Sequence, residues 1–413
     1  MGFLTRLKNY YHLLTAIFFV FFYRFPSRKL TLIGVTGTDG KTTTVNLIYH
    51  LLKSASKKVS MVSSVNAVIG DKVYDTGFHV TTPDPGDVQK YLRQAVDAGS
   101  QYFVLESTSH GLVQNRLFGC FFKIGVATNI THEHLDYHKN YRRYLMAKAK
   151  LFSRVKLAVL NKDDRSYLSL SKICKDKKCL TYSLKGKADF TLSNFPFKTN
   201  LLGDYNQANC LAAIAVASSL GVDRKTIQKA LASFKGLVGR LEKIDDGQNF
   251  QVIVDFAHTP NALSKVLELL QKEKAKNGKL IAVFGAAGLR DIKKRFLMGE
   301  VSGNLADVTI LTAEDPRTED VNRIITRMAQ GCNKAGSHEL ELSQIDKIKN
   351  GQRFFFRVPD RGQAIEFAIQ KIAQSGDVVV ICGKGHEKSM CYGKTEYPWS
   401  DQEAALKVLK GRK

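Results

Sequence analysis

The sequence predicts an α/β protein in which a phosphate-loop central domain with a mostly parallel sheet precedes a C-terminal Rossmann-like α/β domain. Two series of short apolar runs alternate with helix-length amphipathic stretches, one on each side of a glycine-containing turn at residues 236–242. Runs such as LTLIGVTG and DVVVICGKGH are typical of strands buried on both faces of a parallel sheet. We therefore expect a central domain at residues 30–236 and a C-terminal domain at residues 237–413, after a hydrophobic helix at residues 1–29.

The composition is that of a folded protein with anionic partners. With 413 residues, of which 44% are hydrophobic and 24% charged, each domain can bury a core of its own. The 62 Lys and Arg residues outnumber the 38 Asp and Glu residues, and the net charge of +24 favours nucleotides, nucleic acid or an anionic membrane surface as partners. The seven cysteines show no zinc-knuckle or redox spacing, which indicates reduced thiols and a cytoplasmic protein.

The N-terminal segment has the composition of a membrane-seeking helix. Its uncharged run, Asn9 to Tyr23, is shorter than the roughly 18 to 20 residues that cross a bilayer, and no small-residue cleavage site follows it. Basic flanks suit an anionic lipid surface, and tyrosines suit the headgroup region. We predict a monomer whose residues 9–25 contact the inner face of the cell membrane. The alternatives are a helix that covers an apolar groove of the protein itself and a dimer contact.

A phosphate-binding loop is the first chemical motif along the chain. The segment Leu30 to Lys53 reads as a strand, a glycine turn with the sequence GVTGTDGKTTT, and a helix. Backbone amides at Gly37 and Gly40 can hold phosphate oxygens at the positive end of the helix, while Lys41 neutralises their charge and the Thr42 hydroxyl can reach Mg²⁺. Val35 stands where the strict consensus has glycine, so the loop is a variant of the motif.

Two further strand ends carry polar residues. Glu106 closes the apolar run YFVLE, at the end of a parallel strand where binding sites form. The run from Asn129 to His138 contains three histidines and two acids. Alone, such a run is more often a solvated surface or a hydrogen-bonded cluster. Beside a phosphate loop it predicts metal ligands, because phosphoryl transfer requires metal ions to neutralise charge.

Five segments in this order resemble the central domain of the Mur ligase family: TGTDGKTT, TTP, ESTSHGLVQNR, NITHEHLDYH and YLMAKAKLF. The likeness covers about residues 30–410, and within the family it is strongest to the diaminopimelate-adding UDP-N-acetylmuramyl-tripeptide synthetases. It implies an ATP- and Mg²⁺-dependent acid–amino-acid ligase of peptidoglycan precursor synthesis. The carboxylate of a UDP-MurNAc-dipeptide-like acceptor becomes an acyl phosphate, which the amine of a diamino acid then opens to an amide.

The resemblance also implies roles for residues of the central domain. The implied catalytic residues are Lys41, Glu106, His134 and Lys148. Thr42 and Glu106 would hold one Mg²⁺, while His134 and a carbamylated Lys148 would support a second. Without the family, Lys148 and Lys150 read as solvated charges on a helix. The implied ATP contacts are Gly37, Thr38, Asp39, Gly40, Lys41, Thr42, Thr43 and Asn129, and the implied acceptor contacts are Thr81, Thr82, Thr108, Gln114 and Arg116.

In the C-terminal half, GRLE and VIVDFAHTP resemble family segments that reach the nucleotide after domain closure, which implies ATP contacts at Arg240, Asp255 and His258. Arg240 also fits a surface salt bridge. AEDPRTED and GKGHE resemble the segments that bind the incoming amino acid. The implied contacts are Arg290, Glu314, Asp315, Pro316, Arg317, Gly383 and Glu387. An arginine at 317 suits the distal carboxylate that diaminopimelate has and lysine lacks, whereas Asp315, in place of the usual asparagine, suits lysine. We favour diaminopimelate.

Other functions remain open at this point. Full-length relatives begin with a uridine-binding domain, for which the residues before Leu30 leave no room, so the resemblance implies a chain that lacks it. A related ligase with another acceptor, such as a folylpolyglutamate synthase, shares the phosphate loop but not the HGLVQNR and EDPR segments. A non-catalytic nucleotide-binding membrane scaffold is a further alternative. A nucleic-acid-dependent NTPase would explain the charge, but no recognition module supports it, and we expect no nucleic-acid partner.

Overall fold

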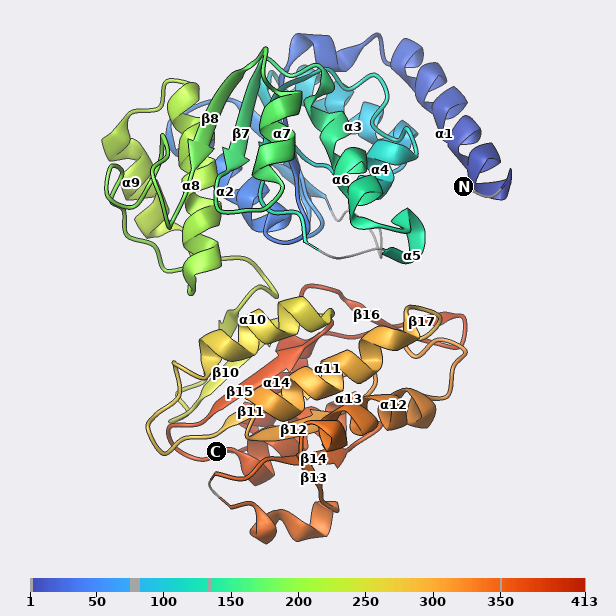
Figure 1. Ribbon diagram of the computed structural model, residues 1–413, viewed down its shortest axis with the longest axis vertical. Coiled ribbons are helices and arrows are strands. Elements are labelled where there is room, and N and C mark those ends of the chain that lie inside the picture. Colours follow the sequence, from blue (N-terminus) through green and yellow to red (C-terminus); the bar gives the residue numbers. More distant parts are fainter. Residues whose placement is uncertain (1–2, 75–81, 132–134, 350, 413) are drawn as a thin grey trace. The chain divides into compact units, whose positions relative to one another are not determined.

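The protein is described by a computed structural model that covers residues 3–74, 82–131, 135–349 and 351–412. The chain forms two compact units, residues 1–235 (unit 1) and 236–413 (unit 2), each with its own sheet and core (Figure 1). Both units are α/β, and most of their strands are parallel, as the sequence predicts.

Within the described residues, unit 1 contains an eight-stranded sheet. Six strands are parallel, and β3 and β4 form an antiparallel edge. In sheet order the strands are β4 (Lys72–Tyr74), β3 (Ala67–Ile69), β2 (Val59–Val62), β5 (Tyr102–Glu106), β1 (Thr31–Thr36), β6 (Phe122–Ala127), β7 (Leu157–Asn161) and β8 (Lys178–Tyr182). Because β5 and β6 flank β1, Val35 pairs with both Glu106 and Val126, and three strand ends meet at one edge.

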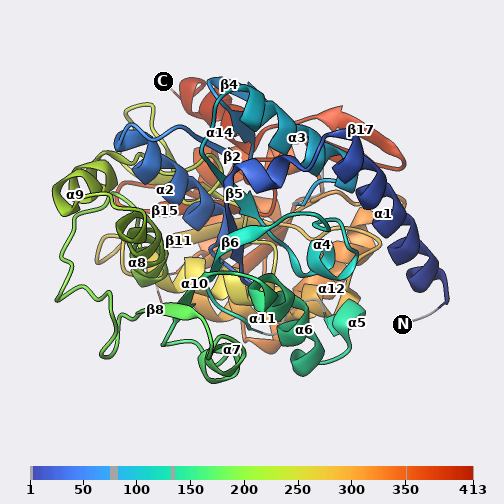
Figure 2. The same cartoon turned by 90° about the horizontal axis from the view of Figure 1, so that it is seen from above.

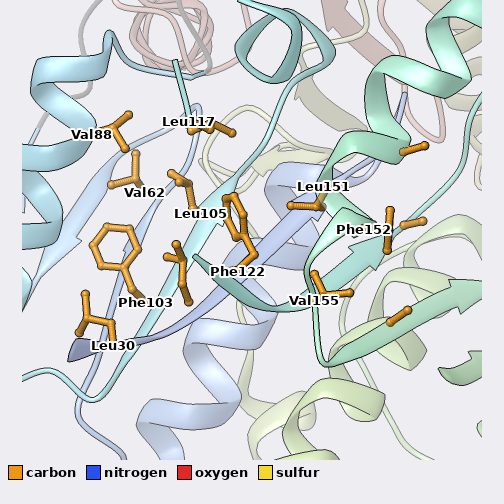
Figure 3. Close-up of a cluster of buried hydrophobic side chains, with 14 of the residues drawn as sticks. Leu30, Val62, Val88, Phe103, Leu105, Leu117, Phe122, Leu151, Phe152 and Val155 are labelled. Atoms are coloured by element: carbon orange, nitrogen blue, oxygen red, sulfur yellow. The ribbon is translucent and has the colours of Figure 1, made fainter. Parts of the chain in front are cut away.

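Helices, one of them buried along most of its length, accompany the sheet of unit 1. They are α1 (Phe3–Phe22), α2 (Lys41–Ser54), α3 (Pro85–Asp97), α4 (Ser109–Val113), α5 (Leu135–His138), α6 (Tyr141–Ala149), α7 (Tyr167–Ile173), α8 (Asp204–Ser219) and α9 (Arg224–Ser233), with 3₁₀ turns η1 (Pro26–Lys29) and η2 (Lys150–Ser153). Side chains from α3, α6 and α7 join the sheet in one hydrophobic cluster (Figure 3). The alanine-rich α8 is buried from Asn209 to Ala217, and its small side chains allow close packing against α2.

The N-terminal helix α1 belongs to unit 1 and packs against α3 (Figure 2). The Phe19 ring lies against Gly86 of α3, and Val20 lies against Gly119 in the segment before β6. Both contacts are so close that a Cβ on either glycine would collide with them. Among the described residues, no helix combines the length and the apolar character needed to cross a membrane.

Unit 2 contains a seven-stranded sheet in the part of the chain that the structure describes. In sheet order the strands are β13 (His338–Glu339), β14 (Phe354–Arg357), β12 (Val308–Leu311), β11 (Leu280–Phe284), β15 (Val378–Cys382), β10 (Gln251–Asp255) and the antiparallel β9 (Glu242–Ile244). A separate hairpin consists of β16 (Ser389–Tyr392) and β17 (Thr395–Pro398). The helices are α10 (Pro260–Leu270), α11 (Ile292–Leu305), α12 (Val321–Lys334), α13 (Arg361–Glu366) and α14 (Asp401–Lys410), with a 3₁₀ turn η3 (Leu342–Lys347) and a π-helical turn η4 (Phe367–Ile372).

Both faces of this second sheet are buried, which explains the continuous apolar runs. Alternate residues of each central strand enter different clusters: Ile253 and Ala282 pack with α10, α11 and α12, whereas Val252 and Ile281 pack with α13, η4 and α14. A strand covered on both sides needs apolar residues at every position rather than at every second one.

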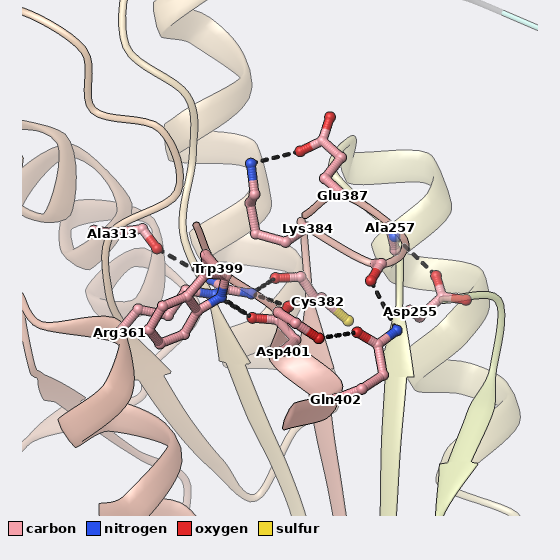
Figure 4. Close-up of polar contacts among 12 residues, drawn as sticks. Asp255, Ala257, Ala313, Arg361, Cys382, Lys384, Glu387, Trp399, Asp401 and Gln402 are labelled. Carbon is pink, nitrogen blue, oxygen red and sulfur yellow. Dashed lines mark hydrogen bonds and ion pairs between the residues drawn. The ribbon is translucent and has the colours of Figure 1, made fainter. Parts of the chain in front are cut away.

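A fully buried ion pair joins the elements of unit 2 (Figure 4). The Arg361 guanidinium donates two hydrogen bonds of 2.7 Å to the Asp401 carboxylate, and the Trp399 indole donates a third, of 2.8 Å. Arg361 also donates to the carbonyl oxygens of Ala313 and Cys382, each at 3.0 Å. The pair therefore connects the start of α14 to the chain segments that leave β12 and β15.

We expect Asp401→Ala to lower the free energy of unfolding of unit 2 by about 3–5 kcal/mol, because it leaves the Arg361 charge buried without its anion. The double variant Arg361→Leu/Asp401→Leu should lose much less than the two single losses combined. Glu403→Ala, on the exposed side of α14, should change stability by no more than about 0.5 kcal/mol. Denaturant unfolding followed by fluorescence of Trp399, the single tryptophan of the chain, measures these variants and the single variants Arg361→Leu and Asp401→Leu. If the double variant loses as much stability as the two single variants together, Arg361 and Asp401 do not stabilise the fold as a pair.

Candidate nucleotide and amino-acid sites

The predicted phosphate loop connects β1 to α2 with the geometry that its glycines require. β1 ends at Thr36 and α2 begins at Lys41, so residues 37–40 form the loop. Gly40 has a φ of 80°, a left-handed conformation that glycine adopts without strain. A Cβ on Gly37 would collide with the side chain of Thr128. The first amides of α2 have no acceptor within the helix, as at any helix N-terminus, and can bind an anion.

Asn129, just beyond β6, holds this loop in shape. The Asp39 amide donates to Asn129 Oδ1 and Asn129 Nδ2 donates to the Asp39 carbonyl, each at 3.0 Å. The Thr38 amide donates to the Asn129 carbonyl at 2.7 Å, and Lys41 Nζ donates to the Thr38 carbonyl at 2.7 Å. The residues predicted to bind ATP from Gly37 to Thr43 thus stand on one turn that Asn129 fixes.

Glu106 and Thr42 lie side by side at the edge where β5 meets β1. The Thr42 hydroxyl is 3.0 Å and 3.2 Å from the two oxygens of Glu106, which is 1% exposed. The Ser64 amide and hydroxyl donate to Glu106 Oε2 at 2.9 Å and 3.0 Å. A carboxylate and a hydroxyl beside an anion-binding helix end are hard oxygen donors of the kind that Mg²⁺ prefers, so these side chains fit that ion.

Lys148 on α6 is buried against the phosphate loop. Its side chain is 2% exposed, its Nζ donates to the Gly37 carbonyl, and it lies 4.6 Å from the centre of the Tyr144 ring. The interpretation of Lys148 as a solvated charge is therefore wrong, because the start of α6 turns this side of the helix toward the loop. Lys150, two residues later, is exposed as that interpretation predicts.

The described acceptor residues gather around the end of β5. The Thr82 and Thr108 hydroxyls are 2.8 Å apart, and the Thr108 hydroxyl caps α4 by accepting from the Gly111 amide at 3.1 Å. Arg116 donates to the Thr82 carbonyl at 3.0 Å, and Gln114 Nε2 lies 3.5 Å from Tyr137 Oη.

Two predicted site residues, Thr81 and His134, lie outside the described residues. The later end of the histidine-rich run is described, and there His138 is buried with its Nε2 at 3.0 Å from Ser109 Oγ. Among the described residues, no group of three His, Cys, Asp or Glu side chains could hold a metal ion. The described part of this run forms a hydrogen-bonded cluster.

In unit 2, the residues predicted to reach the nucleotide form one cluster at the end of β10. The Arg240 guanidinium stacks over the Phe256 ring at 4.6 Å rather than in a surface salt bridge. Asp255 accepts from the amides of Leu241 and Ala257, each at 2.8 Å, and burial raises the pKa of its carboxyl although Arg240 opposes this. His258 Nδ1 lies 2.9 Å from the Phe256 carbonyl. Asp255 thus shapes the two segments that carry Arg240 and His258.

The predicted amino-acid residues meet where the chain leaves β12 and β15. Lys384, which is completely buried, bridges Asp315 at 2.8 Å and Glu387 at 2.6 Å. Glu314 is also buried, and its Oε2 has no hydrogen-bond partner in the described part of the chain. Burial raises the pKa of the Glu314 carboxyl to about 7, against the opposing effect of nearby cations including Lys294 and Lys384. The cluster thus holds two acids that share the charge of Lys384, Asp315 and Glu387, and one acid with an unused oxygen, Glu314.

The neighbouring positions define the backbone around these acids. Gly383 has a φ of 116°, and a Cβ there would lie 2.8 Å from Glu314 Oε2. Pro316 is buried, and its carbonyl packs so closely against Gly288 that only glycine fits. Arg317 is held in the left-handed region by backbone hydrogen bonds to the β16–β17 hairpin. Arg290 is exposed on the segment that follows Gly288.

Several residues of these sites escaped the sequence patterns. Asn209 of α8 receives a hydrogen bond of 3.3 Å from Thr44, and its side chain leaves no room for a Cβ on Gly40. An isolated asparagine in an alanine-rich helix carries no local signal. Ser64 is equally unmarked. Lys384 stands inside the GKGHE segment. Its positive charge was the one sequence feature that could have indicated its ion pairs with Asp315 and Glu387.

Two family models together match most of the chain. The Mur ligase middle domain matches residues 35–217, and the Mur ligase glutamate ligase domain matches residues 239–385. The chain is 41% identical to the UDP-N-acetylmuramyl-tripeptide synthetase of Borreliella afzelii, over 94% of this chain and 78% of that protein. It is 39% identical to the UDP-N-acetylmuramoyl-L-alanyl-D-glutamate--2,6-diaminopimelate ligase of Synechococcus elongatus, over 95% of this chain and 79% of that protein.

Solved structures give a consistent picture. A UDP-N-acetylmuramoyl-L-alanyl-D-glutamate--2,6-diaminopimelate ligase superimposes with a TM-score of 0.63 and 32% identity, over 93% of this chain and 79% of that chain. A Mycobacterium tuberculosis folylpolyglutamate synthase complexed with ADP and AMPPCP gives a TM-score of 0.66 at 15% identity, over 90% and 92% of the two chains. At that identity, the second likeness shows the shared fold alone.

We expect the stability difference between Glu314→Gln and the unaltered protein to depend on pH. Between the ordinary pKa of 4.5 and the folded-state pKa of about 7, the unfolded chain releases the Glu314 proton while the folded chain keeps it. The unaltered protein therefore loses stability as pH rises through this window, by up to about 3 kcal/mol, whereas the variant does not. Urea unfolding at pH 5 and pH 8 measures this, with exposed Glu403→Gln as the control. A difference that is equal at both pH values would contradict the assignment.

Proposed function

This chain belongs to the Mur ligase family, and from that membership we propose that it joins a diamino acid to the D-glutamate carboxylate of a UDP-MurNAc-dipeptide-like acceptor. It is an ATP-dependent acid–amino-acid ligase, and the relatives most similar to it carry the names of peptidoglycan-precursor ligases. The observation that carries the proposal is the meeting of the Lys41 loop, the Thr42–Glu106 pair and buried Lys148 at one edge of the sheet in unit 1.

The chemistry follows from what this edge can stabilise. One oxygen of the acceptor carboxylate attacks the γ-phosphorus of ATP, the bond to the β-phosphate oxygen breaks, and an acyl phosphate and ADP result. The amides at the start of α2 and the Lys41 ammonium stabilise the negative charge on the phosphoryl oxygens. Mg²⁺, which Thr42 and Glu106 would hold, supplies further neutralisation of the phosphate charge when bound. The amine then attacks the acyl carbon, and phosphate leaves as the amide forms.

The acceptor would lie against the residues gathered around the end of β5. Hydroxyls at Thr82 and Thr108 and the guanidinium of Arg116 are donors suited to a sugar and a peptide carboxylate. Gln114 Oε1 and Arg116 Nε are buried without a hydrogen-bond partner among the described residues. Buried polar groups of this kind are expected to bind either water or a ligand.

Diaminopimelate is the amino acid that the second site favours. An unpaired Asp315 would attract the side-chain amine of lysine, but Asp315 is already paired with Lys384 at 2.8 Å, which it shares with Glu387. Arg317 has no ion pair within the described residues and is half-buried, so its guanidinium is available for a second carboxylate. Glu314 can accept a hydrogen bond from an ammonium group through its unused oxygen. A ligand with two amines and two carboxylates satisfies all of these groups.

The proposal includes a monomeric protein in the cytoplasm whose residues 9–25 contact the inner membrane face. All seven cysteines lie within the described residues and are free thiols, which suits a reducing compartment. A folylpolyglutamate-synthase-like ligase shares the fold, but no contact among the described residues favours that acceptor over a muropeptide.

Purified protein with ATP, Mg²⁺, UDP-MurNAc-dipeptide and either diaminopimelate or lysine tests the proposal by mass detection of the product. We expect a tripeptide product with diaminopimelate and at least about tenfold lower kcat/KM with lysine.

Lys41→Ala should reduce kcat on the order of a thousandfold, because Lys41 neutralises the transferring phosphoryl group. Lys53→Ala, on the exposed face of the same helix, is the control and should be fully active. Faster turnover of lysine would overturn the specificity, and full activity of Lys41→Ala would overturn the mechanism.

Lys148→Ala should reduce ligation on the order of a hundredfold, because it removes the buried group that contacts the phosphate loop. If Lys148 carries a carbamate, millimolar formate or acetate should restore part of the activity of the variant by replacing an anionic oxygen ligand. Lys150→Ala, two residues away and exposed, should ligate at the normal rate with or without added formate or acetate. A Lys148→Ala protein that ligates at the normal rate would show that this lysine has no part in the reaction.

A further inference from the structure

The outward face of α1 carries the most extensive row of exposed apolar side chains on unit 1. Its six members, which we call the α1 face, are between 60% and 67% exposed: Tyr10, Tyr11, Leu14, Phe18, Phe21 and Phe22. At about 100° per residue, they occupy an arc of about 120° on one side of the helix. Large exposed patches of this kind mark interaction surfaces in folded proteins.

The opposite side of the same helix is also apolar, but it is packed on the protein. His12, Ala16 and Val20 are buried on an arc that points away from the α1 face. The close contacts of Phe19 with Gly86 and of Val20 with Gly119 fix the helix against α3 and the segment before β6. A helix that is apolar all round requires an apolar phase on each side. Within the described residues of unit 1, that phase is supplied on the inner side only.

Basic residues border the α1 face, and the sequence around it contains no acidic residue. The first 38 residues contain three arginines, two lysines and no Asp or Glu. Arg24, Arg28 and Lys29 are exposed just beyond the C-terminal end of α1. The Arg28 guanidinium lies 4.5 Å from the Phe25 ring and 5.2 Å from the Phe121 ring, so charge and aromatic surface are continuous. Asp97, whose carboxylate interacts with the charge of Lys29, is already paired with Arg93 of its own helix.

We propose that the α1 face is a docking surface for an anionic lipid bilayer, on which α1 lies in the plane of the interface. Phenylalanines on this face enter the region between headgroups and acyl chains, tyrosines stay near the headgroups, and the basic end binds lipid phosphates. Charge complementarity selects an anionic bilayer over a second copy of the chain, because the first 38 residues of a second copy would offer basic residues and no Asp or Glu to pair with them. This docking rests on the membrane contact included in the proposed function and specifies its face and lipid charge. It is independent of the ligase chemistry, whose proposed residues lie on other elements.

Co-sedimentation of the full chain with phosphatidylcholine vesicles that contain 30% phosphatidylglycerol tests this surface. Phe18→Ser/Phe22→Ser should lower the partition coefficient by at least about tenfold, since it removes two aromatic rings from the bilayer interface. Leu168→Ser, which replaces a 70% exposed leucine of α7, is the matched control and should bind like the unaltered protein. Ligation of soluble substrates should be unchanged in both variants. Equal binding of the Phe18→Ser/Phe22→Ser variant and the unaltered protein would overturn the proposal.

A second pair of variants tests the role of charge. Arg24→Gln/Lys29→Gln should weaken binding to the anionic vesicles by at least about threefold, whereas the control Lys172→Gln/Lys175→Gln, two exposed lysines near α7, should not. Pure phosphatidylcholine vesicles and raised salt should weaken binding of the unaltered protein. Light scattering of the protein without vesicles tests the alternative occupant, a second copy of the chain. A dimer that Phe18→Ser/Phe22→Ser converts to monomer, together with no vesicle binding, would assign the face to a second copy and overturn the proposal.

Discussion

The parallel pairing of β5 and β6 on either side of β1 is the constraint on which the nucleotide site depends. Parallel strands end at the same edge, so the register that pairs Val35 with Glu106 and Val126 brings together the phosphate loop, the acid at the end of β5 and Asn129 after β6. The helix that follows the loop then supplies amides, Lys41 and Thr42 at that point. The buried contact of Lys148 with Gly37 adds a fourth chain segment to the same edge. Side chains far apart in sequence thus become neighbours through strand order alone.

Unit 2 reaches a comparable arrangement through buried charge. The Arg361–Asp401 pair fixes the segments after β12 and β15, and Lys384 connects the acids that these segments carry. Buried ions are costly unless they are fully paired, so each of these charges constrains the backbone around it. Glu314 is the exception, because its second oxygen is buried without a hydrogen-bond partner in the described chain. That unused acceptor is the strongest local sign that a polar ligand completes the cluster.

Much of this architecture could be predicted from the sequence, for identifiable reasons. The apolar runs, which form strands buried on both faces of the sheets, predict the α/β class. The glycines between an apolar strand and a helix predict the phosphate loop. The burial of Lys148 could not be read from its helix, because a lysine is rarely buried in full and only tertiary packing places this one against Gly37. The same holds for Asn209, which contacts the loop from a helix distant in sequence. The Arg361–Asp401 pair joins residues that are 40 positions apart, beyond the reach of any local pattern.

The central claim is that this edge of the sheet activates a carboxylate by phosphorylation, and the fate of one oxygen atom tests it most directly. The acceptor is prepared with ¹⁸O in its reacting carboxylate and is incubated with ATP, Mg²⁺ and the diamino acid, and the released phosphate is analysed by mass spectrometry. The account predicts that one ¹⁸O atom passes to each phosphate released, in step with amide formation. Amide product accompanied by unlabelled phosphate would contradict it.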